Sequence, residues 1–342
     1  MKKQKGKYEL RRDKVLGRGL SGQVILAYDN EKKVYVAAKY IPNKIYNDNK
    51  ELQYIENEIL TSTECDSENI VKVHDITEID GEKYLMIEYC NGGDLFSSLK
   101  KYREKNGKYL DEKVIQNIIS QILKGLKSLH DHAIVHHDIK PQNILLKYDN
   151  EDDLKNLNYM KCTFKIADFG LSKYKYDNQE KNIGGSPLYM EPTLFSKDVK
   201  DEEIENEKVD IWALGILTYE LLYSFSPFEN KEDNVNFKKN PMRELVKSLN
   251  EGIYYINIYL RKNISLQVIG FLNYCLQIDQ KERLSSEELL FTEFICMEPD
   301  KFTYINSDNL FDKFNLPENI ADDYRIKLDI RDKKDLNKKL GI

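Results

Sequence analysis

The chain has 342 residues, of which 41% are hydrophobic and 32% are charged, and its formal net charge at pH 7 is −6. This composition is typical of a folded globular protein and argues against wholesale disorder. The acidic balance argues against nonspecific binding to nucleic acid or to an anionic membrane surface as the main function. The length fits one large domain or two modest ones.

Secreted and membrane-spanning proteins are also disfavoured by the sequence. The start, MKKQKGKYEL, is basic but no apolar stretch follows it, so it does not resemble a secretory signal. The longest apolar run, Ile211–Leu222, contains Glu220 and is shorter than the roughly 20 residues of a membrane span. The five cysteines are scattered without a C-x-x-C pair, which indicates neither a disulfide framework nor a zinc site. We therefore expect an intracellular protein without membrane insertion, in the cytoplasm or alternatively in the nucleus.

The first part of the chain, residues 8–89, is rich in expected strands. Short runs of β-branched and aromatic residues predict strands at 24–28, 34–38, 70–74 and 84–89. Within 51–64, apolar residues instead recur at spacings of three and four, which predicts a helix. These apolar residues are Leu52, Ile55, Ile59 and Leu60.

The periodicity changes after Asn91-Gly92-Gly93 and becomes helical. A long helix is predicted over 114–130, and further helical patterns cover 212–222, 266–276 and 285–294. Three polar stretches, 149–158, 198–207 and 229–240, are expected to be solvated surface loops. A small β-rich half and a larger helical half predict an α+β fold with a ligand site in the cleft between the halves.

The first chemical motif is a glycine run, Gly17, Gly19 and Gly22, in a G-x-G-x-x-G-x-V pattern that ends at Val24. Glycines let the backbone approach phosphates closely because they carry no Cβ. A dinucleotide-binding unit needs a helix after the glycines and an acid about 20 residues later. Here a strand candidate follows instead, so we expect a β-hairpin that covers phosphates.

The next motif is Lys39, which lies late in the second expected strand. The helix that follows offers Glu51, Glu56 and Glu58 as partners for its ammonium. We expect Glu56, because Leu60 lies four residues later on the same helix face and would place that carboxylate beside the core.

The strongest local signal lies in 134–143. Asp138, Lys140 and Asn143 place a carboxylate, an ammonium and an amide within six residues. Asp168, in Lys165–Gly170, adds a second acid where a strand runs into a turn. Each feature alone has a structural explanation, such as a core histidine for His136, but their order and spacing together point to catalysis.

In this succession the chain resembles the eukaryotic protein-kinase family from Leu16 to about Phe294, and the later segment Asp210–Gly215 and Arg283 fit the same pattern. Lys140 and Gly185-Ser186-Pro187-Leu188-Tyr189 resemble its serine/threonine branch. Lys140–Asn143 and Gly185–Met190 are most similar to the autophagy-initiating kinases.

The resemblance implies a two-lobed α+β fold for residues 8–294. The small β-rich N-lobe would span about 8–89, the hinge 88–94 and the mostly helical C-lobe 95–294. The remaining segment, 295–342, is rich in aromatic residues, and we expect it to pack on the C-lobe as an extension.

The resemblance also implies ATP and Mg²⁺, or alternatively Mn²⁺, and protein substrates with serine or threonine acceptors. Asp138 would orient the acceptor hydroxyl and take its proton, while Lys140 steadies the γ-phosphate. Asn143 and Asp168 would hold the metal ions. Lys39, held by Glu56, would bind the α- and β-phosphates beneath the glycines Gly17, Gly19 and Gly22.

The adenine site is implied by the same likeness. Its apolar faces would come from Leu16, Val24, Ala37 and Leu145. The Glu88 carbonyl and the Cys90 backbone would read the edge of the base, with Ile87 as gatekeeper. Asp94 would meet the ribose or, alternatively, a substrate arginine.

Three positions depart from the family pattern. His137 replaces an arginine that usually receives a phosphate, and the loop 171–185 offers only Ser172, Tyr174 and Tyr176 as hydroxyls. We therefore predict activity without loop phosphorylation. Thr193 replaces a glutamate that usually pairs with the arginine matched by Arg283, so we expect that arginine to lack its partner, and we do not expect Glu191 to substitute.

The third departure is an insertion of two residues in 61–69, which keeps Glu58 as the alternative to Glu56. Gln142 stands where basic-directed relatives carry glutamate, which predicts at most a weak preference for basic residues before the acceptor.

The leading interpretation is an active serine/threonine kinase, because the residues expected to carry the reaction are intact, namely Lys39, Glu56, Asp138, Asn143 and Asp168. The main alternative is a pseudokinase that acts as a binding or scaffold module, which His137 and Thr193 favour. A small-molecule kinase is a second alternative, disfavoured because 185–192 resembles a peptide-docking segment.

Overall fold

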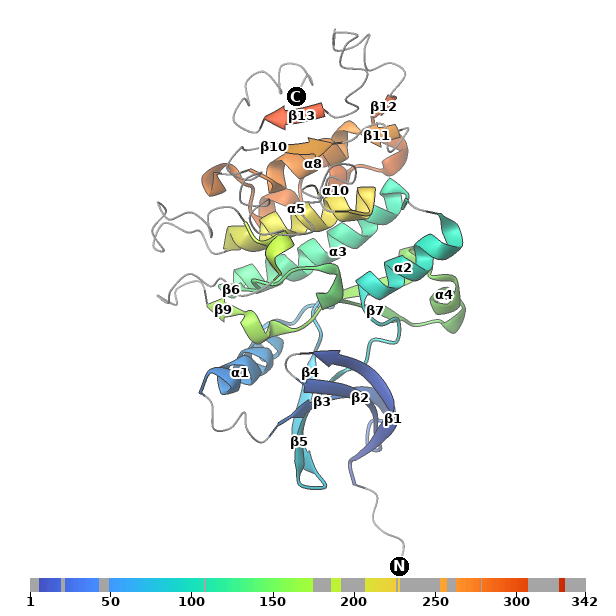
Figure 1. Ribbon diagram of the computed structural model, residues 1–342, viewed down its shortest axis with the longest axis vertical. Coiled ribbons are helices and arrows are strands. Elements are labelled where there is room, and N and C mark those ends of the chain that lie inside the picture. The colour runs from blue at the N-terminus through green and yellow to red at the C-terminus, as the bar shows by residue number, and fades with distance from the viewer. Residues whose placement is uncertain are drawn as a thin grey trace, which may run out of the picture. The chain divides into compact units, whose positions relative to one another are not determined.

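The computed structural model describes residues 6–19, 22–42, 49–107, 109–174, 186–191, 207–225, 227, 253–256, 263–277, 279–306 and 326–329. Their contacts divide these residues into two compact units. Figure 1 labels the helices and strands that they form. The first unit contains the chain up to Tyr102 together with Pro141–Lys173, and the second contains Arg103–Lys140 and the chain from Tyr174 onward. Thr193, most of 198–207, all of 229–240 and residues 175–185 lie outside the described part.

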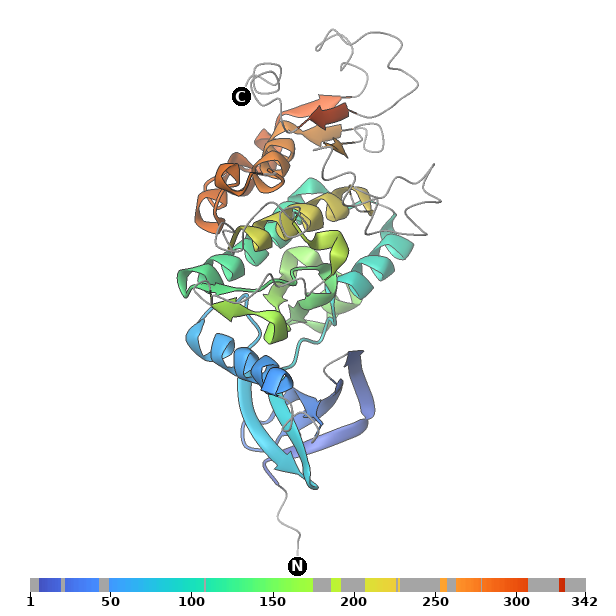
Figure 2. The same cartoon turned by 60° about the vertical axis from the view of Figure 1, so that its left-hand side comes forward.

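The first unit is built on a five-stranded antiparallel sheet with the order β1-β2-β3-β5-β4. Its strands are β1 (Tyr8–Gly19), β2 (Gly22–Asp29), β3 (Val34–Ile41), β4 (Val73–Ile79) and β5 (Glu82–Glu88). Figure 2 shows how β1 and β2 curve along one side of this sheet. One face buries a core of Tyr8, Ile25, Ala27, Val36, Ala38, Tyr84 and Met86, whose apolar side chains alternate with more exposed ones along the strands.

The glycine run joins β1 to β2 as an antiparallel hairpin, with Gly19 opposite Gly22, which confirms the expected strand-to-strand context. Gly22 has φ +121°, and a Cβ there would lie 2.7 Å from the Tyr40 carbonyl oxygen. Only glycine fits this position.

Helix α1 (Asn49–Glu64) covers the other side of the sheet, as predicted from its apolar spacing. Ile55 and Ile59 pack against Ile41 and Leu85 from β3 and β5. The adjoining strand β4 begins at Val73, later than the predicted start at Ile70. Ile70 instead forms a parallel bridge with Ile166, so this apolar residue is buried outside the sheet.

The first unit also contains an antiparallel hairpin of β7 (Ile144–Tyr148) and β8 (Cys162–Ile166). The predicted surface loop 149–158 contains a short helix, α4 (Glu151–Asn156). Asn150 begins this helix by accepting a hydrogen bond from the Asp152 amide at 2.7 Å. Three acidic residues in its first turn favour the helix through its dipole, which explains why a charged stretch is ordered here.

The second unit is mainly helical, as predicted. Its principal helices are α3 (Glu112–Asp131), α5 (Glu207–Tyr223), α8 (Leu266–Cys275), α9 (Ser286–Leu289) and α10 (Glu293–Cys296). Helices α3 and α5 run side by side (Figures 1 and 2). Almost every residue of α5 is buried, so this apolar run forms the centre of the unit.

The described residues also form one further helix and several short segments. Helix α2 (Leu95–Asn106) begins in the first unit and ends in the second. Strand β6 (Ile134–Val135) directly precedes the segment 136–143, and strand β9 (Lys173–Tyr174) follows the turn that begins at Asp168. Short 3₁₀ helices cover 141–143, 159–161, 169–171, 187–189, 280–282 and 299–301.

The last described segments pair with strands of the helical unit. Strand β12 (Tyr304–Asn306) pairs with β11 (Asn263–Ser265), and β13 (Ile326–Asp329) pairs with β10 (Ile253–Ile256). The Phe302 side chain is buried, with its ring centroid 5.9 Å from that of Phe294.

Candidate active site

A cluster of opposite charges occupies the first unit at Lys39. The Lys39 Nζ on β3 lies 2.7 and 2.9 Å from the two carboxylate oxygens of Glu58 on α1. The Asp168 Oδ1 is 3.7 Å from the same nitrogen. The Lys39 and Glu58 side chains are only 12% and 7% exposed, so this ion pair is largely removed from water.

The partner of Lys39 is therefore Glu58, and the prediction from the sequence that Glu56 holds this lysine was wrong. That choice assumed that Leu60 lies on the buried face of α1, whereas Leu60 is 38% exposed and Glu56 is exposed as well. Glu58 and Thr61, three residues apart, are both buried. The alternative named from the sequence holds the lysine.

Burial and charge act in opposite directions on this cluster. Desolvation disfavours the Lys39 cation, but Glu58 and Asp168 more than offset it, so the pKa of Lys39 is held above its ordinary value. Desolvation raises the pKa of Glu58, and the Lys39 cation offsets this only in part. The lysine is thus kept charged, and a charged ammonium can bind an anion.

The strand register brings the glycine hairpin to the same place. Gly17 lies opposite Val24, and Val24 lies opposite Lys39 on the next strand. The hairpin glycines and the charged lysine thus belong to neighbouring rows of one sheet, an arrangement suited to binding an anion.

Asp168 and Asn143 lie close together at the end of the β7–β8 hairpin. The Ala167 amide donates to the Asn143 carbonyl oxygen at 2.9 Å, which ties the two segments together directly before Asp168. Asp168 has φ 65°, a left-handed conformation that is strained for a residue with a Cβ. Carboxylate and amide oxygens are ligands that Mg²⁺ prefers, so these two side chains fit the metal.

The segment that follows β5 contains the residues expected around adenine. Ala37 lies opposite Ile87 in the sheet. Cys90, Val71 and Ala167 form a buried cluster against which Ile87 and Leu145 pack. Leu16 is 43% exposed and Val24 is half-buried.

Asp94 forms contacts within the first unit through both its backbone and its side chain. Its backbone forms a bridge to Leu145, and its Oδ1 accepts a hydrogen bond from the Ser97 amide at 2.8 Å at the start of α2. The side chain therefore caps the helix. The alternatives of a ribose or a substrate arginine stay open as predictions.

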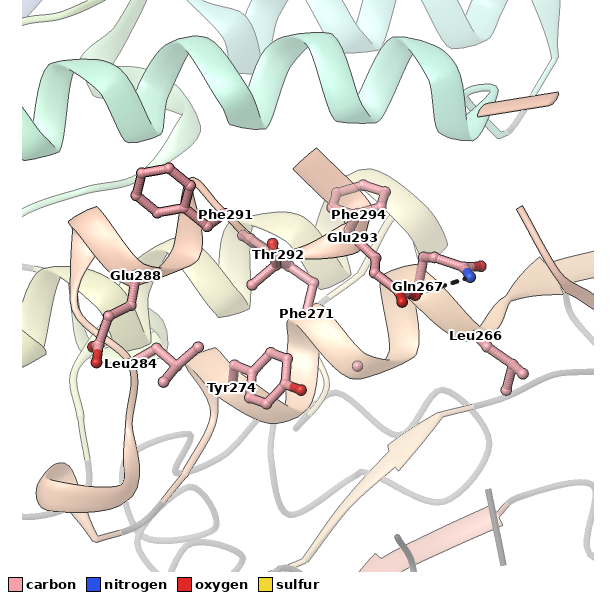
Figure 3. Close-up of a pocket in the computed structure, with 11 residues that line it drawn as sticks. Leu266, Gln267, Phe271, Tyr274, Leu284, Glu288, Phe291, Thr292, Glu293 and Phe294 are labelled. Atoms are coloured by element: carbon pink, nitrogen blue, oxygen red, sulfur yellow. Dashed lines mark hydrogen bonds between the residues drawn. The ribbon is translucent and has the colours of Figure 1, made fainter. Parts of the chain in front are cut away.

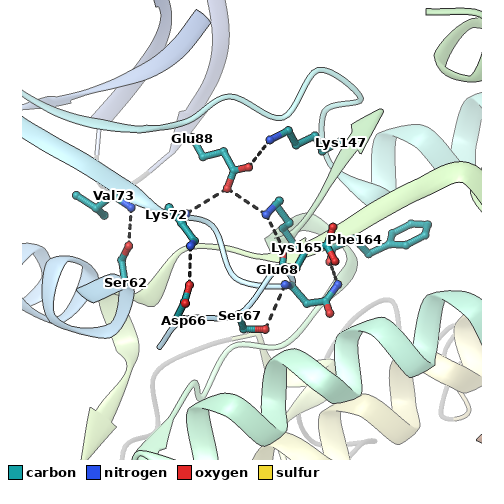
Figure 4. A network of polar contacts seen from close by, with 11 residues as sticks. Ser62, Asp66, Ser67, Glu68, Lys72, Val73, Glu88, Lys147, Phe164 and Lys165 are labelled. Atoms are coloured by element: carbon teal, nitrogen blue, oxygen red, sulfur yellow. Dashed lines mark hydrogen bonds and ion pairs between the residues drawn. The ribbon is translucent and has the colours of Figure 1, made fainter. Parts of the chain in front are cut away.

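Sequence reasoning missed a network around the Glu88 side chain (Figure 4). Its two carboxylate oxygens lie 2.6 Å from Lys147 Nζ and 3.1 Å from Lys165 Nζ. Lys165 also donates to the Glu68 carbonyl oxygen at 2.5 Å. Lys147 and Lys165 could be recognised as partners of one carboxylate only once the pairing of β7 with β8 is known, because that pairing places the two lysines on neighbouring strands.

The second unit holds a polar cluster formed by residues of the 134–143 motif and by Ser186. Lys140 Nζ lies 2.6 Å from Asp138 Oδ2 and donates to Ser186 Oγ at 2.9 Å. The Ser186 amide donates to the other Asp138 oxygen at 3.1 Å. Asp138, Lys140 and Ser186 thus form one hydrogen-bonded group, and Ser186 was not assigned a role from the sequence.

The backbone next to Asp138 is anchored by Asp210 of α5. The amides of His136 and His137 donate to its two carboxylate oxygens at 2.8 and 2.9 Å. The Nε2 of His130 lies 3.1 Å from one of them. Burial would raise the pKa of Asp210, but His130 and the neighbouring histidines hold it below its ordinary value.

Arg283 does have a carboxylate partner, contrary to the expectation from Thr193. Its Nη1 lies 2.6 Å from Glu191 Oε2, and neither side chain has any exposure. Gln280 donates to the other Glu191 oxygen. Glu191 reaches the guanidinium from two residues earlier in the chain, which reverses the prediction that it could not substitute.

A hollow of about 650 Å³ lies elsewhere in the second unit, between α8 and the α9–α10 segment (Figure 3). Phe271, Tyr274, Leu284 and Phe291 contribute its apolar lining, with Glu288 and Glu293 also present. None of the candidate site residues lines it. The hollow is therefore separate from the candidate active site.

Comparison with known proteins places these clusters in context. Residues 10–295 match the protein kinase domain family. The chain is 32% identical to an Aurora kinase of Encephalitozoon cuniculi, over 82% of this chain and 92% of that protein. It is 29% identical to human calcium/calmodulin-dependent protein kinase type 1B, over 90% of this chain and 77% of that protein. Within the described residues, no helix is long and apolar enough to cross a membrane.

Proposed function

Because the chain belongs to the protein kinase family, we propose that it is an active serine/threonine kinase, which transfers the γ-phosphate of ATP to hydroxyls of protein substrates. The observation that carries this proposal is the buried Lys39–Glu58 pair with Asp168 beside it. Burying such charges costs stability, which a phosphate-binding role explains better than a purely structural one.

Each cluster supports one part of the reaction. Lys39, supported by Glu58, would bind the α- and β-phosphates under Gly17, Gly19 and Gly22. Asp168 and Asn143 would hold Mg²⁺ or Mn²⁺, which when bound neutralises phosphate charge. The apolar residues Leu16, Val24, Ala37 and Leu145, with the backbone of Glu88 and Cys90, would bind adenine.

Asp138 would accept the proton of the substrate hydroxyl. Its Oδ2 is held by Lys140 and its Oδ1 by the Ser186 amide, so the carboxylate is fixed in orientation. Lys140, which donates a hydrogen bond to Asp138, would stabilise the transferred phosphoryl group. Asp210 fixes the backbone that carries Asp138.

The test is phosphate transfer from Mg-ATP to a degenerate peptide array, with the unaltered chain beside Asp138→Asn. We expect labelling of serine and threonine peptides by the unaltered chain and a loss of at least about a hundredfold in the variant. Equal signals from the two proteins would favour the pseudokinase alternative.

Activity without loop phosphorylation is part of the proposal. Ser172, one of the three hydroxyl residues of the loop, is only 1% exposed, so its hydroxyl is inaccessible in this conformation. Phosphatase treatment of the purified protein should therefore leave its turnover unchanged. Abolished turnover would contradict this part.

The domain bounds and the location of the protein are further parts of this proposal. We propose a kinase domain over 8–294, with 295–342 as an extension on its helical part, and an intracellular location. We also propose, from the motif likeness of Lys140–Asn143 and Gly185–Met190, a relationship in sequence to the autophagy-initiating kinases.

A further inference from the structure

Helix α1 is attached to the segment that follows Asp168 by the side chain of Asn57. Its Nδ2 donates to the Ser172 carbonyl oxygen at 2.7 Å. Asn57 is half-buried and directly precedes Glu58 in the helix. The residue beside the lysine partner thus forms a polar link to the end of the Asp168 turn.

That turn needs support from outside itself. Asp168 is left-handed, and the following 3₁₀ turn, Phe169–Leu171, closes with a hydrogen bond from the Ser172 amide to the Phe169 carbonyl oxygen at 3.0 Å. Ser172 is 1% exposed, and its hydroxyl has no hydrogen-bond partner among the described residues. The bond from Asn57 therefore satisfies a carbonyl that is also buried away from water.

The helix geometry links the two contacts. Consecutive residues of an α-helix are rotated by about 100° and shifted by about 1.5 Å. Glu58 binds Lys39 on β3, while Asn57 binds the segment after β8, so the two residues hold α1 at two separate places. Fixing Asn57 fixes the rotation of α1 about its axis and hence the direction of the Glu58 carboxylate.

We propose that Asn57 is a positioning residue that keeps Glu58 on Lys39 and Asp168 in its left-handed turn. Its contact is made within the folded first unit and needs no phosphate on the loop. The effect on turnover rests on the proposed kinase function, whereas the effect on the order of α1 does not.

The test is Asn57→Asp, which keeps the size of the side chain, removes its N–H donors and places a carboxylate against a carbonyl. Asn106→Asp, at the exposed end of α2, is the matched control for the same chemical change. Hydrogen–deuterium exchange of peptides from 49–64 and 168–172 reports the order of both segments. Steady-state assays give kcat and the KM for ATP and for the peptide separately.

We expect about three- to tenfold faster exchange in Asn57→Asp than in the unaltered chain or the control, as loss of a hydrogen bond implies. The value of kcat should fall by a similar factor with the peptide KM unchanged, a split that general destabilisation would not produce. Asn57→Ala, which adds no charge, gives the same comparison if the carboxylate unfolds the protein.

Unchanged exchange in both segments would overturn the proposal, whatever the activity. Faster exchange with an unchanged kcat would also overturn it, because Asn57 would then not position the reacting groups. If the unaltered chain shows no turnover, the proposed function fails, and the exchange result still decides whether Asn57 holds α1 in place.

Discussion

Arg283 and Glu191 form an ion pair, 2.6 Å between Nη1 and Oε2, in which both side chains are completely buried. The other two guanidinium nitrogens are also engaged, since Nε and Nη2 donate to the Gln277 carbonyl at 3.1 and 2.7 Å. The guanidinium lies 5.1 Å from the ring centroid of Trp212 in α5. The pair therefore joins the segment before Thr193 to the centre of the helical unit.

Removing one partner of this pair should be strongly destabilising. In Glu191→Ala the buried guanidinium would lose its counter-charge, and the free energy of unfolding should fall by about 3–5 kcal/mol. Urea denaturation measures this change. Glu287→Ala is the control, because the Glu287 side chain is 67% exposed and should contribute little. Similar unfolding midpoints for the two variants would show that the pair contributes no net stability.

Two glutamates on one helix give a matched test of the proposed binding of phosphates by Lys39. Glu58→Gln removes the charge that faces Lys39, so kcat/KM for ATP should fall by about 10- to 100-fold, the range for a charge-assisted hydrogen bond. Glu56→Gln, two residues earlier and exposed, should leave kcat/KM within about twofold of the unaltered value.

Steady-state kinetics with varied ATP separates the two outcomes. Because both substitutions remove one negative charge from α1, any difference between them reflects position and not net charge. Loss of activity in Glu56→Gln with none in Glu58→Gln would show that the helix is rotated differently in the working protein.

The order of motifs along the chain was enough to predict the fold and to single out Lys39, Asp138, Lys140 and Asp168, which the structure places in two charged clusters, because glycine and charge spacings are local properties. The rotation of α1 was not predictable in this way. Leu60 fits the apolar spacing as well as Ile59 does, yet it is exposed, and the choice between Glu56 and Glu58 depends on which face meets the sheet.

Contacts between segments that are far apart in the sequence could not be predicted either. Glu191 was not predicted as the partner because the family pattern places the glutamate at position 193 and the same backbone path was expected here. In the structure, the Glu191 carboxylate contacts Arg283 from two residues earlier in the chain. The lysines around Glu88 are 59 and 77 residues away from it, and their approach depends on how β7 and β8 pair.

Asp210 should matter for turnover but not for nucleotide affinity. Its carboxylate accepts the amides of His136 and His137, which lie directly before Asp138. In Asp210→Asn one oxygen acceptor becomes a donor, so one of these amides would lose its partner and the Asp138 backbone would be less well fixed.

We expect kcat to fall by about 10-fold or more in Asp210→Asn. The Kd for Mg-ATP, measured by calorimetry, should stay within about twofold, since Lys39 and Asp168 belong to the other unit. Glu220 lies on the same helix, but it accepts a hydrogen bond from Tyr189, so it is no suitable control. Asp131→Asn at the end of α3 is used instead, because the Asp131 side chain is 52% exposed and its ion pair with Lys127 lies at the surface, where such a pair contributes little. A large loss of Mg-ATP affinity in Asp210→Asn alone would contradict the separation of the two roles.

The Glu88 network predicts a stability that depends on acid. Burial would raise the pKa of Glu88, but Lys147 and Lys165 more than offset it, and its pKa is held below the ordinary value. A carboxylate with a lowered folded-state pKa stabilises the protein fully above its unfolded pKa of about 4.3, and this contribution is lost as the pH falls through the folded-state pKa.

Glu88→Gln should therefore lower the free energy of unfolding by about 1.5–3 kcal/mol at pH 7, because the Lys165 ammonium, 5% exposed, loses its charged acceptor. The difference from the unaltered chain should begin to shrink as the pH falls below the unfolded pKa of about 4.3, and it should go on shrinking as the pH falls through the lower folded-state pKa of Glu88. Urea denaturation at a series of pH values from 7 to about 3 measures both quantities, with the exposed Glu78→Gln as control. A difference that stays constant down to the lowest pH would show that the side chain acts through its shape and not through its charge.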